Sequence, residues 1–499
     1  MMADMPREKR MFGALFLGLI ALHLALVLSA RLYPFTDLPD HLAAATIARH
    51  AGESSNAFAE FYRVETFLKP NTFHLRFCGL ALFPSVELAN RVFFAVYVVL
   101  FPLSVLLVVR KLGGNPWFAF LSFLFVYNYN VSWGFVGFAF AVPLALLFCR
   151  FFVLDERGIV GAPRALGAAA ALALLYFVHV LVALFCAFLM FLRLAALGRR
   201  ALRALPASLA AALPLAALIL AWWSGEGRDY AGPGLSQFLR DYYSDAFVQT
   251  LFRRKSVFIF DNYHLFEGVK GYAIAALFSL GVVVPAIAAL RARGRGASGV
   301  LPLLLAAALC CLFLPNELPQ QAVLYERFSV FLLLALIVFG ASCSPARLPR
   351  AAAAAFVALG ILHYALWASY FFEFNRENAG FDRAFLRPEG SGKKLAGLVF
   401  DYTYRGRPIY IHFPSYYIVW EKGVATASLA DFRFGPVRRG TNAIELPRYL
   451  EWVGKRGNYD GRYRDMDYIL IRGGSAPEGF ELERAAGAWS LYGRAAHAL

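Results

Sequence analysis

The stretch that decides the fold is MFGALFLGLIALHLALVLSA, residues 11–30. It contains no Lys, Arg, Asp or Glu, and its length matches the roughly 20 residues that a helix needs to cross the hydrocarbon core of a bilayer. The basic residues Arg7, Lys9 and Arg10 precede it, as they would in a secretory signal. The apolar run is longer than the roughly 7–15 residues of a signal peptide, however, so we expect a retained first transmembrane helix.

The composition of the whole chain is that of a polytopic membrane protein. Of its 499 residues, 60% are hydrophobic and 16% are charged, and there are 48 Phe, an apolar fraction well above that of soluble domains. The net charge of +16 comes from short basic clusters between apolar runs, so we expect no nucleic-acid partner. The six cysteines include no CxxC pair, which argues against a zinc site or a disulfide framework.

Hydropathy predicts a bundle of about 11 transmembrane helices, although several segments are shorter than a perpendicular span requires. The long apolar stretch between Arg164 and Arg193 is divided at His179, because one helix there would be unusually long. The predicted segments are 11–30, 87–109, 116–130, 133–151, 165–178, 180–197, 206–223, 271–290, 299–315, 322–342 and 350–372.

Loop charges predict the orientation, since cytoplasmic loops accumulate Lys and Arg. With the N-terminus inside, every predicted inner loop is basic, and the division at His179 is what keeps the Arg199, Arg200 and Arg203 cluster inside. We therefore expect a multi-pass protein of the cell inner (plasma) membrane with a cytoplasmic N-terminus. The outer loops 31–86 and 224–270 and everything after residue 372 would then be extracytoplasmic.

The chain is expected to divide into a transmembrane domain, 1–372, and a small extracytoplasmic α/β domain, 373–499. The tail is more polar, and short β-rich runs in it predict strands. These are IYIHF (409–413), YYIVW (416–420), DYILI (467–471) and WSLYG (489–493), with helical patterns near 382–400 and 443–456.

Ionisable side chains follow the first apolar run directly, in YPFTDLPDHLAAATIARH, residues 33–50. On a helix beginning there, Asp37, Asp40 and His41 project from one face. Asp37 as N-cap and Pro39 in the first turn fit an ordinary helix start. The same residues at the rim of an apolar bundle also fit a catalytic role, and the two interpretations are compatible.

Four other polar residues are predicted to reach the same outer surface from distant parts of the chain: Asn128, His179, Glu326 and Arg327. Asn128 also fits an interfacial packing role, and His179 fits a structural histidine. Arg327 either extends to the membrane interface or binds a phosphate, for which a guanidinium is well shaped. Together the four are candidate substrate-binding residues.

This layout resembles the GT-C superfamily of integral-membrane glycosyltransferases. The matching features are a single first span, a large outer loop that opens with Asp37 and Asp40, short paired spans and an outward tail. The resemblance implies transfer of a sugar from a polyprenyl-phosphate-linked donor to a glycan, lipid or protein acceptor, usually with inversion. It implies Asp37 or Asp40 as catalytic base, with His41 beside them, and Arg327 as phosphate ligand.

The acidic motif departs from the GT-C pattern, which leaves other functions open. Many members carry adjacent acids or Asp-x-Asp, whereas this chain has Asp-x-x-Asp-His. Which acid is the base, and whether Asp37 and Asp40 bind a divalent cation such as Mg or Mn, are therefore open. The alternatives are a transporter or flippase, and a surface-polysaccharide polymerase or ligase centred on loop 224–270.

Overall fold

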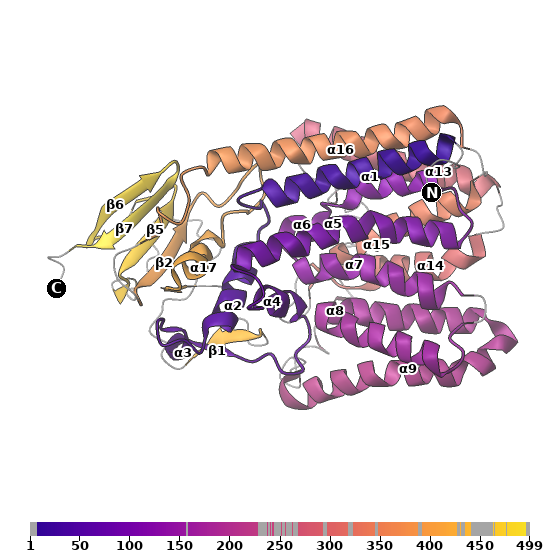
Figure 1. Cartoon of the computed structure of the whole chain (residues 1–499), viewed down its shortest axis with the longest axis horizontal. Coiled ribbons are helices and arrows are strands. Elements are labelled where there is room, and N and C mark those ends of the chain that lie inside the picture. The colour runs from indigo at the N-terminus through magenta and orange to yellow at the C-terminus, as the bar shows by residue number, and fades with distance from the viewer. Residues whose placement is uncertain are drawn as a thin grey trace. The chain divides into compact units, whose positions relative to one another are not determined.

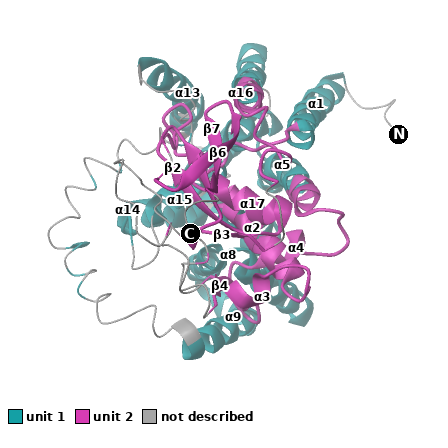
Figure 2. Cartoon of the chain, turned by 90° about the vertical axis from the view of Figure 1, so that its left-hand side faces the viewer, with its two compact units in different colours: residues 1–29, 94–131, 136–368 teal, residues 30–93, 132–135, 369–499 magenta. Residues whose placement is uncertain are grey.

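The computed structural model divides into two compact units (Figure 2). Unit 1 comprises residues 1–29, 94–131 and 136–368, and unit 2 comprises residues 30–93, 132–135 and 369–499. The structure describes residues 7–155, 158–227, 268–292, 297–317, 323–344, 348–387, 392–426, 435–440, 465–475 and 477–495, with isolated positions between 237 and 262 and at 430 and 463.

Long apolar helices make up the described part of unit 1 (Figure 1). Eight helices in the described ranges are long and apolar enough to cross a membrane, as expected of a membrane-embedded protein. Helices α5 and α16 also contribute residues to unit 2. The eight helices are α1 (Arg7–Ser29), α5 (Val86–Lys111), α7 (Val136–Phe148, continued to Val153 by a π-helical turn), α8 (Ala162–Ala196), α9 (Ala201–Trp222), α13 (Gly268–Ala292), α15 (Leu324–Cys343) and α16 (Arg350–Glu377); α14 (Ala297–Phe313) is a further, shorter apolar helix.

The predicted apolar segments are all helical, but they do not give 11 long spans among the described residues. The division at His179 is confirmed, because the backbone of α8 is extended at this residue (φ −163°, ψ 112°). Arg164 and Arg193, one on each half of α8, both contact Asp155 (2.7 and 3.3 Å). A continuous helix would hold residues 164 and 193 about 43 Å apart, so the two halves of α8 fold back on each other. Segment 116–130 contains a buried 3₁₀ helix (Pro116–Phe125) and the short α6 (Tyr129–Trp133). Segment 299–315 gives α14, which has 17 residues. With α8 counted once, eight helices among the described residues are long and apolar enough to cross a membrane, and the membrane topology stays a prediction.

Aromatic side chains and small residues pack the helices of unit 1. Phe12 and Phe16 of α1 meet Phe120 of the 3₁₀ segment edge to face, with ring centroids 5.4 and 5.5 Å apart. Gly360 of α16 lies so close to Leu19 and Phe120 that an added Cβ would come within 3.4 Å of Leu19. Such small contact residues allow helices to approach closely without a hydrophobic driving force between them.

Unit 2 combines the first loop with the C-terminal part of the chain. The loop contains α2 (Leu38–His50), α3 (Phe58–Phe61), β1 (Tyr62–Val64) and α4 (Phe73–Cys78). Strand β1 pairs antiparallel with β4 (Val437–Arg439), so the loop and the tail share a two-stranded sheet.

Unit 2 also contains a five-stranded mixed sheet with the order β3-β2-β5-β7-β6. Strand β2 is parallel to β3 and β5, whereas β7 is antiparallel to β5 and β6. The strands are β2 (Lys394–Val399), β3 (Val424–Ala425), β5 (Tyr468–Arg472), β6 (Phe480–Ala486) and β7 (Trp489–Arg494). The predicted small sheet region is thus present.

Two of the four predicted strands are confirmed and two are wrong. DYILI and WSLYG coincide with β5 and β7, whereas IYIHF forms turns and YYIVW forms α17 (Tyr416–Glu421). The helix places Tyr416 on Trp420 with ring centroids 4.7 Å apart, an i,i+4 contact that a strand could not make. The helical pattern at 382–400 is also wrong, because it contains β2, and that at 443–456 lies outside the described residues.

Candidate functional site

The start of α2 fixes the position of Asp37 and Asp40. The amide of Asp37 donates to the carbonyl of Trp133 (3.0 Å). Gly134 allows this approach, since its φ is +81° and an added Cβ would lie 2.6 Å from the Asp37 nitrogen. Asp37 occupies the N-cap position of α2, as expected, but its carboxylate makes no capping hydrogen bond. The side chain is therefore available for another contact.

Both carboxylates contact one imidazole, that of His412. The Nδ1 atom of His412 lies 3.1 Å from Oδ2 of Asp40, and its Nε2 atom lies 3.4 Å from Oδ1 of Asp37. Ser415 donates from its hydroxyl to the other oxygen of Asp40. We call Asp37, Asp40, His412 and Ser415 the Asp–His cluster; all four belong to unit 2.

Burial in the Asp–His cluster changes from one end to the other. The side chain of Asp40 is 1% exposed and that of His412 is 5% exposed, whereas that of Asp37 is 23% exposed. A buried acid, a buried imidazole and a partly exposed acid therefore follow one another. Such a series can take up a proton at Asp37 and stabilise positive charge on the imidazole through Asp40.

The predicted histidine, His41, has a different neighbour. Its ring packs edge to face on His74 of α4, with centroids 5.8 Å apart. His74 donates from Nε2 to Oδ1 of Asn90 (3.0 Å). Burial lowers the pKa of His74 to about 4, and the hydrogen bond to Asn90 offsets part of this decrease. The imidazole that joins the two aspartates is thus His412.

Asn128 and His179, two of the predicted substrate-binding residues, lie in unit 1 and have packing contacts there. Asn128 is buried and donates to the Tyr97 hydroxyl (3.3 Å) and to the Phe125 carbonyl (2.8 Å). The buried ring of His179 packs on Phe138, with centroids 5.0 Å apart. These contacts fit the packing roles considered for both residues.

Glu326 and Arg327, the other two predicted residues, also belong to unit 1, in the first turn of α15. Glu326 is buried, and the carbonyl of Arg327 accepts from the Asn130 amide (3.1 Å). A role for either residue in substrate binding stays a prediction. Most of loop 224–270, including residues 228–236 and 263–267, lies outside the described residues.

His412 and Ser415 are the members of the cluster that the sequence did not reveal. Ser415 is 375 positions away from Asp40, so no local spacing connects them. His412 lies in the predicted strand IYIHF (409–413), and Ser415 lies between that strand and the predicted strand YYIVW (416–420). The only local signal is that they are the polar residues on either side of Pro414 in an otherwise apolar and aromatic run.

The described residues offer no clear ligand set for the predicted divalent cation. No group of three or more His, Cys, Asp and Glu side chains there is arranged to hold a metal ion. Asp37 and Asp40, the expected ligands, face opposite nitrogens of the same imidazole. This donor set suits proton transfer better than the all-oxygen coordination that Mg²⁺ prefers.

No known protein family, curated protein or solved structure matches the chain.

Proposed function

We propose that the protein is an integral-membrane glycosyltransferase that transfers a sugar from a polyprenyl-phosphate-linked donor to an acceptor hydroxyl. The observation that carries the proposal is the Asp–His cluster: a partly exposed carboxylate, Asp37, in contact with the buried pair His412 and Asp40. A base of this kind is what an inverting transfer needs. The apolar helices of unit 1 fit a lipid-linked donor.

In the proposed reaction the acceptor oxygen attacks the anomeric carbon of the donor. The bond from that carbon to the phosphate oxygen breaks, and the phosphate leaves with the electron pair. Asp37 takes the proton of the acceptor hydroxyl as the new bond forms, which makes the oxygen a better nucleophile. His412 orients Asp37, and Asp40 and Ser415 hold His412 in turn.

A cavity in unit 2 offers positive charge for the leaving phosphate. It has a volume of about 200 Å³, and Tyr416, the residue after Ser415 of the Asp–His cluster, contributes to its wall. More arginines than acids line it, and developing negative charge is stabilised by such groups. The charged lining residues are Arg31, Arg91, Arg383, Glu87 and Asp382. Arg327, the candidate from the sequence, remains a second proposal for this role.

The experiment is transfer of a radiolabelled sugar from a panel of polyprenyl-phosphate hexoses in membrane vesicles. We expect Asp37→Asn to lower the rate by about 10²–10⁴, the usual contribution of a general base. Asp465→Asn, which changes an exposed aspartate of the same unit, is the matched control. Full activity of Asp37→Asn at normal expression, or no transfer by the unmodified protein with any donor, would overturn the proposal.

One observation favours the transporter alternative. Two buried histidines lie within candidate spans of unit 1: His23 in α1 and His363 in α16. His23 Nδ1 is 3.2 Å from the Tyr127 hydroxyl, and the ring of Tyr127 stacks with that of His363. Ionisable residues inside spans often mark ion or proton paths. Proton-coupled uptake that is lost in His363→Phe but kept in Asp37→Asn would support this alternative.

A further inference from the structure

A second, larger cavity of unit 2 lies apart from every residue of the Asp–His cluster. Its volume is about 550 Å³, within the range of small-molecule sites (about 300–1,000 Å³). The end of α16, the segment that follows β2 and the end of β5 contribute its walls. Six charged residues line it: Glu373, Arg376, Glu377, Asp401, Arg405 and Arg472. We call it the six-charge cavity.

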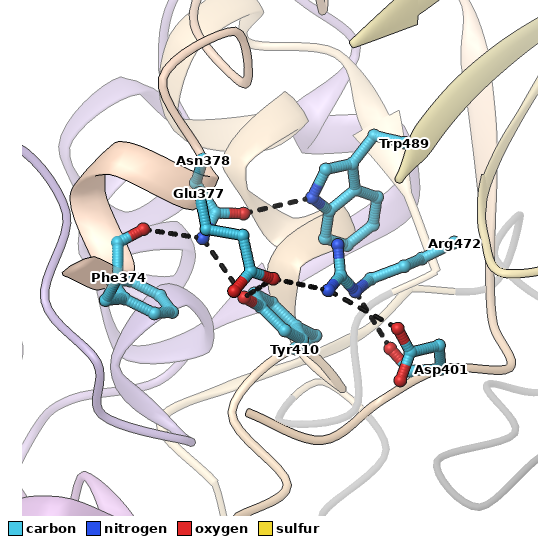
Figure 3. A network of polar contacts seen from close by, with 7 residues as sticks. All are labelled: Phe374, Glu377, Asn378, Asp401, Tyr410, Arg472 and Trp489. Carbon is cyan, nitrogen blue, oxygen red and sulfur yellow. Dashed lines mark hydrogen bonds and ion pairs between the residues drawn. The ribbon is translucent and has the colours of Figure 1, made fainter. Parts of the chain in front are cut away.

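One wall of the six-charge cavity is held by Arg472 (Figure 3). Its side chain is only 5% exposed, and Nη2 lies 2.7 Å from Oε1 of Glu377. Nε donates to the carbonyl of Asp401 (3.0 Å), and the guanidinium lies 3.8 Å from the ring centroid of Tyr410. The Tyr410 hydroxyl donates to the same oxygen of Glu377 (2.8 Å). Arg472 and Glu377 are therefore fixed in place before any ligand arrives.

Arg405 shapes another wall through an unusual backbone conformation. A tight hairpin joins Tyr404 to Arg407 by two backbone hydrogen bonds (2.8 and 3.1 Å), and its central residues, Arg405 and Gly406, have φ of +48° and +75°. Arginine rarely adopts this left-handed region, and such residues cluster at functional sites. Its guanidinium pairs with Glu373 and lies 5.6 Å from the Tyr404 ring centroid.

The charges of the six-charge cavity define the class of ligand. Three guanidinium groups and three carboxylates line it, so their formal charges cancel. An anion would face three carboxylates and a cation three guanidinium groups. A hydroxyl, in contrast, can donate to a carboxylate while it accepts from a guanidinium. A ligand with several neighbouring hydroxyls matches this alternation best.

We propose that the six-charge cavity binds a neutral saccharide. The side chains of Asp401 and Glu377 are 52% and 40% exposed, so their oxygens are accessible to a ligand from solvent. Arg376 and Thr403 add further hydrogen-bonding groups to the rim. The inference goes beyond the proposed transfer reaction, because binding here needs no chemistry at Asp37.

The test is saturation-transfer NMR on the full chain in lipid nanodiscs without sugar-containing detergent. The neutral probes are glucose, galactose, mannose, N-acetylglucosamine, maltose and cellobiose; the anionic probes are inorganic phosphate and glucuronic acid. We expect at least one neutral probe to bind. Its affinity should fall about tenfold or more in Asp401→Asn and in Arg376→Gln, because each variant removes a charged hydrogen-bonding group.

Matched variants on exposed positions of the same unit are Asp465→Asn and Arg494→Gln, which should bind as the unmodified protein does. Binding of no neutral probe, binding of the anions alone, or binding that is unchanged in Asp401→Asn and Arg376→Gln would overturn the inference. Asp37→Asn separates the two proposals. It should lower the transfer rate by about 10²–10⁴ and leave saccharide binding intact, so either proposal can fail without the other.

Discussion

Two buried histidines, His412 in unit 2 and His363 in unit 1, have opposite surroundings. His412 lies between two carboxylates, at 3.1 and 3.4 Å. His363 is packed among aromatic rings, including Tyr127 and Phe278, and neither of its ring nitrogens has a hydrogen-bond partner among the described residues. The rings of His412 and His363 are buried to a similar extent, so the two sites differ in the groups that surround each ring. Carboxylates compensate an imidazolium charge and allow proton transfer, whereas an aromatic shell does not.

The largest effect should follow from removing the buried acid of the Asp–His cluster. Asp40→Ala leaves the Ser415 hydroxyl and the His412 ring buried without their common acceptor. We expect the free energy of unfolding to fall by about 3 kcal/mol, since groups left buried without a partner carry the full cost of desolvation. Urea titration in detergent micelles measures it. Asp465→Ala is the control, and a loss below about 1 kcal/mol would show that the contacts to Asp40 contribute little.

A third buried histidine, His74, has a neutral hydrogen-bond partner, the side chain of Asn90, and burial lowers its pKa. Its pKa is about 4 in the folded protein and near 6.5 when unfolded, so between these values the unfolded chain binds the extra proton. Stability is therefore complete above pH 6.5 and decreases as the pH falls towards 4, by up to about 1.4 kcal/mol per pH unit.

The measurement is the free energy of unfolding from pH 8 to 4, compared with that of His74→Gln. Glutamine keeps a donor for Asn90 but does not titrate, so the decrease below pH 6.5 should be shallower in the variant. Identical slopes in the two proteins would mean that other groups cause the acid sensitivity. A steeper decrease in the variant would contradict the predicted sign.

The helices could be predicted from the sequence because each apolar run carries its own signal. Residues 11–30 are apolar enough to require a lipid or protein environment wherever they pack, and they form most of α1. In the tail the local signal predicted β5 and β7 correctly but failed for α17. YYIVW has strong β-propensity, yet Tyr416 stacks on Trp420 in a helix, because tertiary packing outweighs a preference of about 1 kcal/mol.

Two of the four residues of the Asp–His cluster, Asp37 and Asp40, could be predicted, again because their signal is local in the sequence. Asp37 and Asp40 are neighbours in sequence, and a helix start brings them to one face. His412 meets them only through folding of the tail against the first loop within unit 2, and no spacing rule connects such distant residues. His41, which the spacing favoured, packs on His74 instead.

The smallest effect should come from His363, and it completes the comparison. His363→Phe removes two ring nitrogens that have no partner among the described residues and keeps an aromatic ring of similar size among Tyr127 and Phe278. We expect stability to be unchanged or to rise by up to about 1 kcal/mol, because an unsatisfied buried polar atom is replaced by carbon. His412→Phe should instead lose stability, since it leaves Asp40 buried without the imidazole. Urea titration of the two variants side by side measures both changes in the free energy of unfolding. A marked loss in His363→Phe would show that this ring has a polar partner in the membrane, and the histidines of the two units would then be alike.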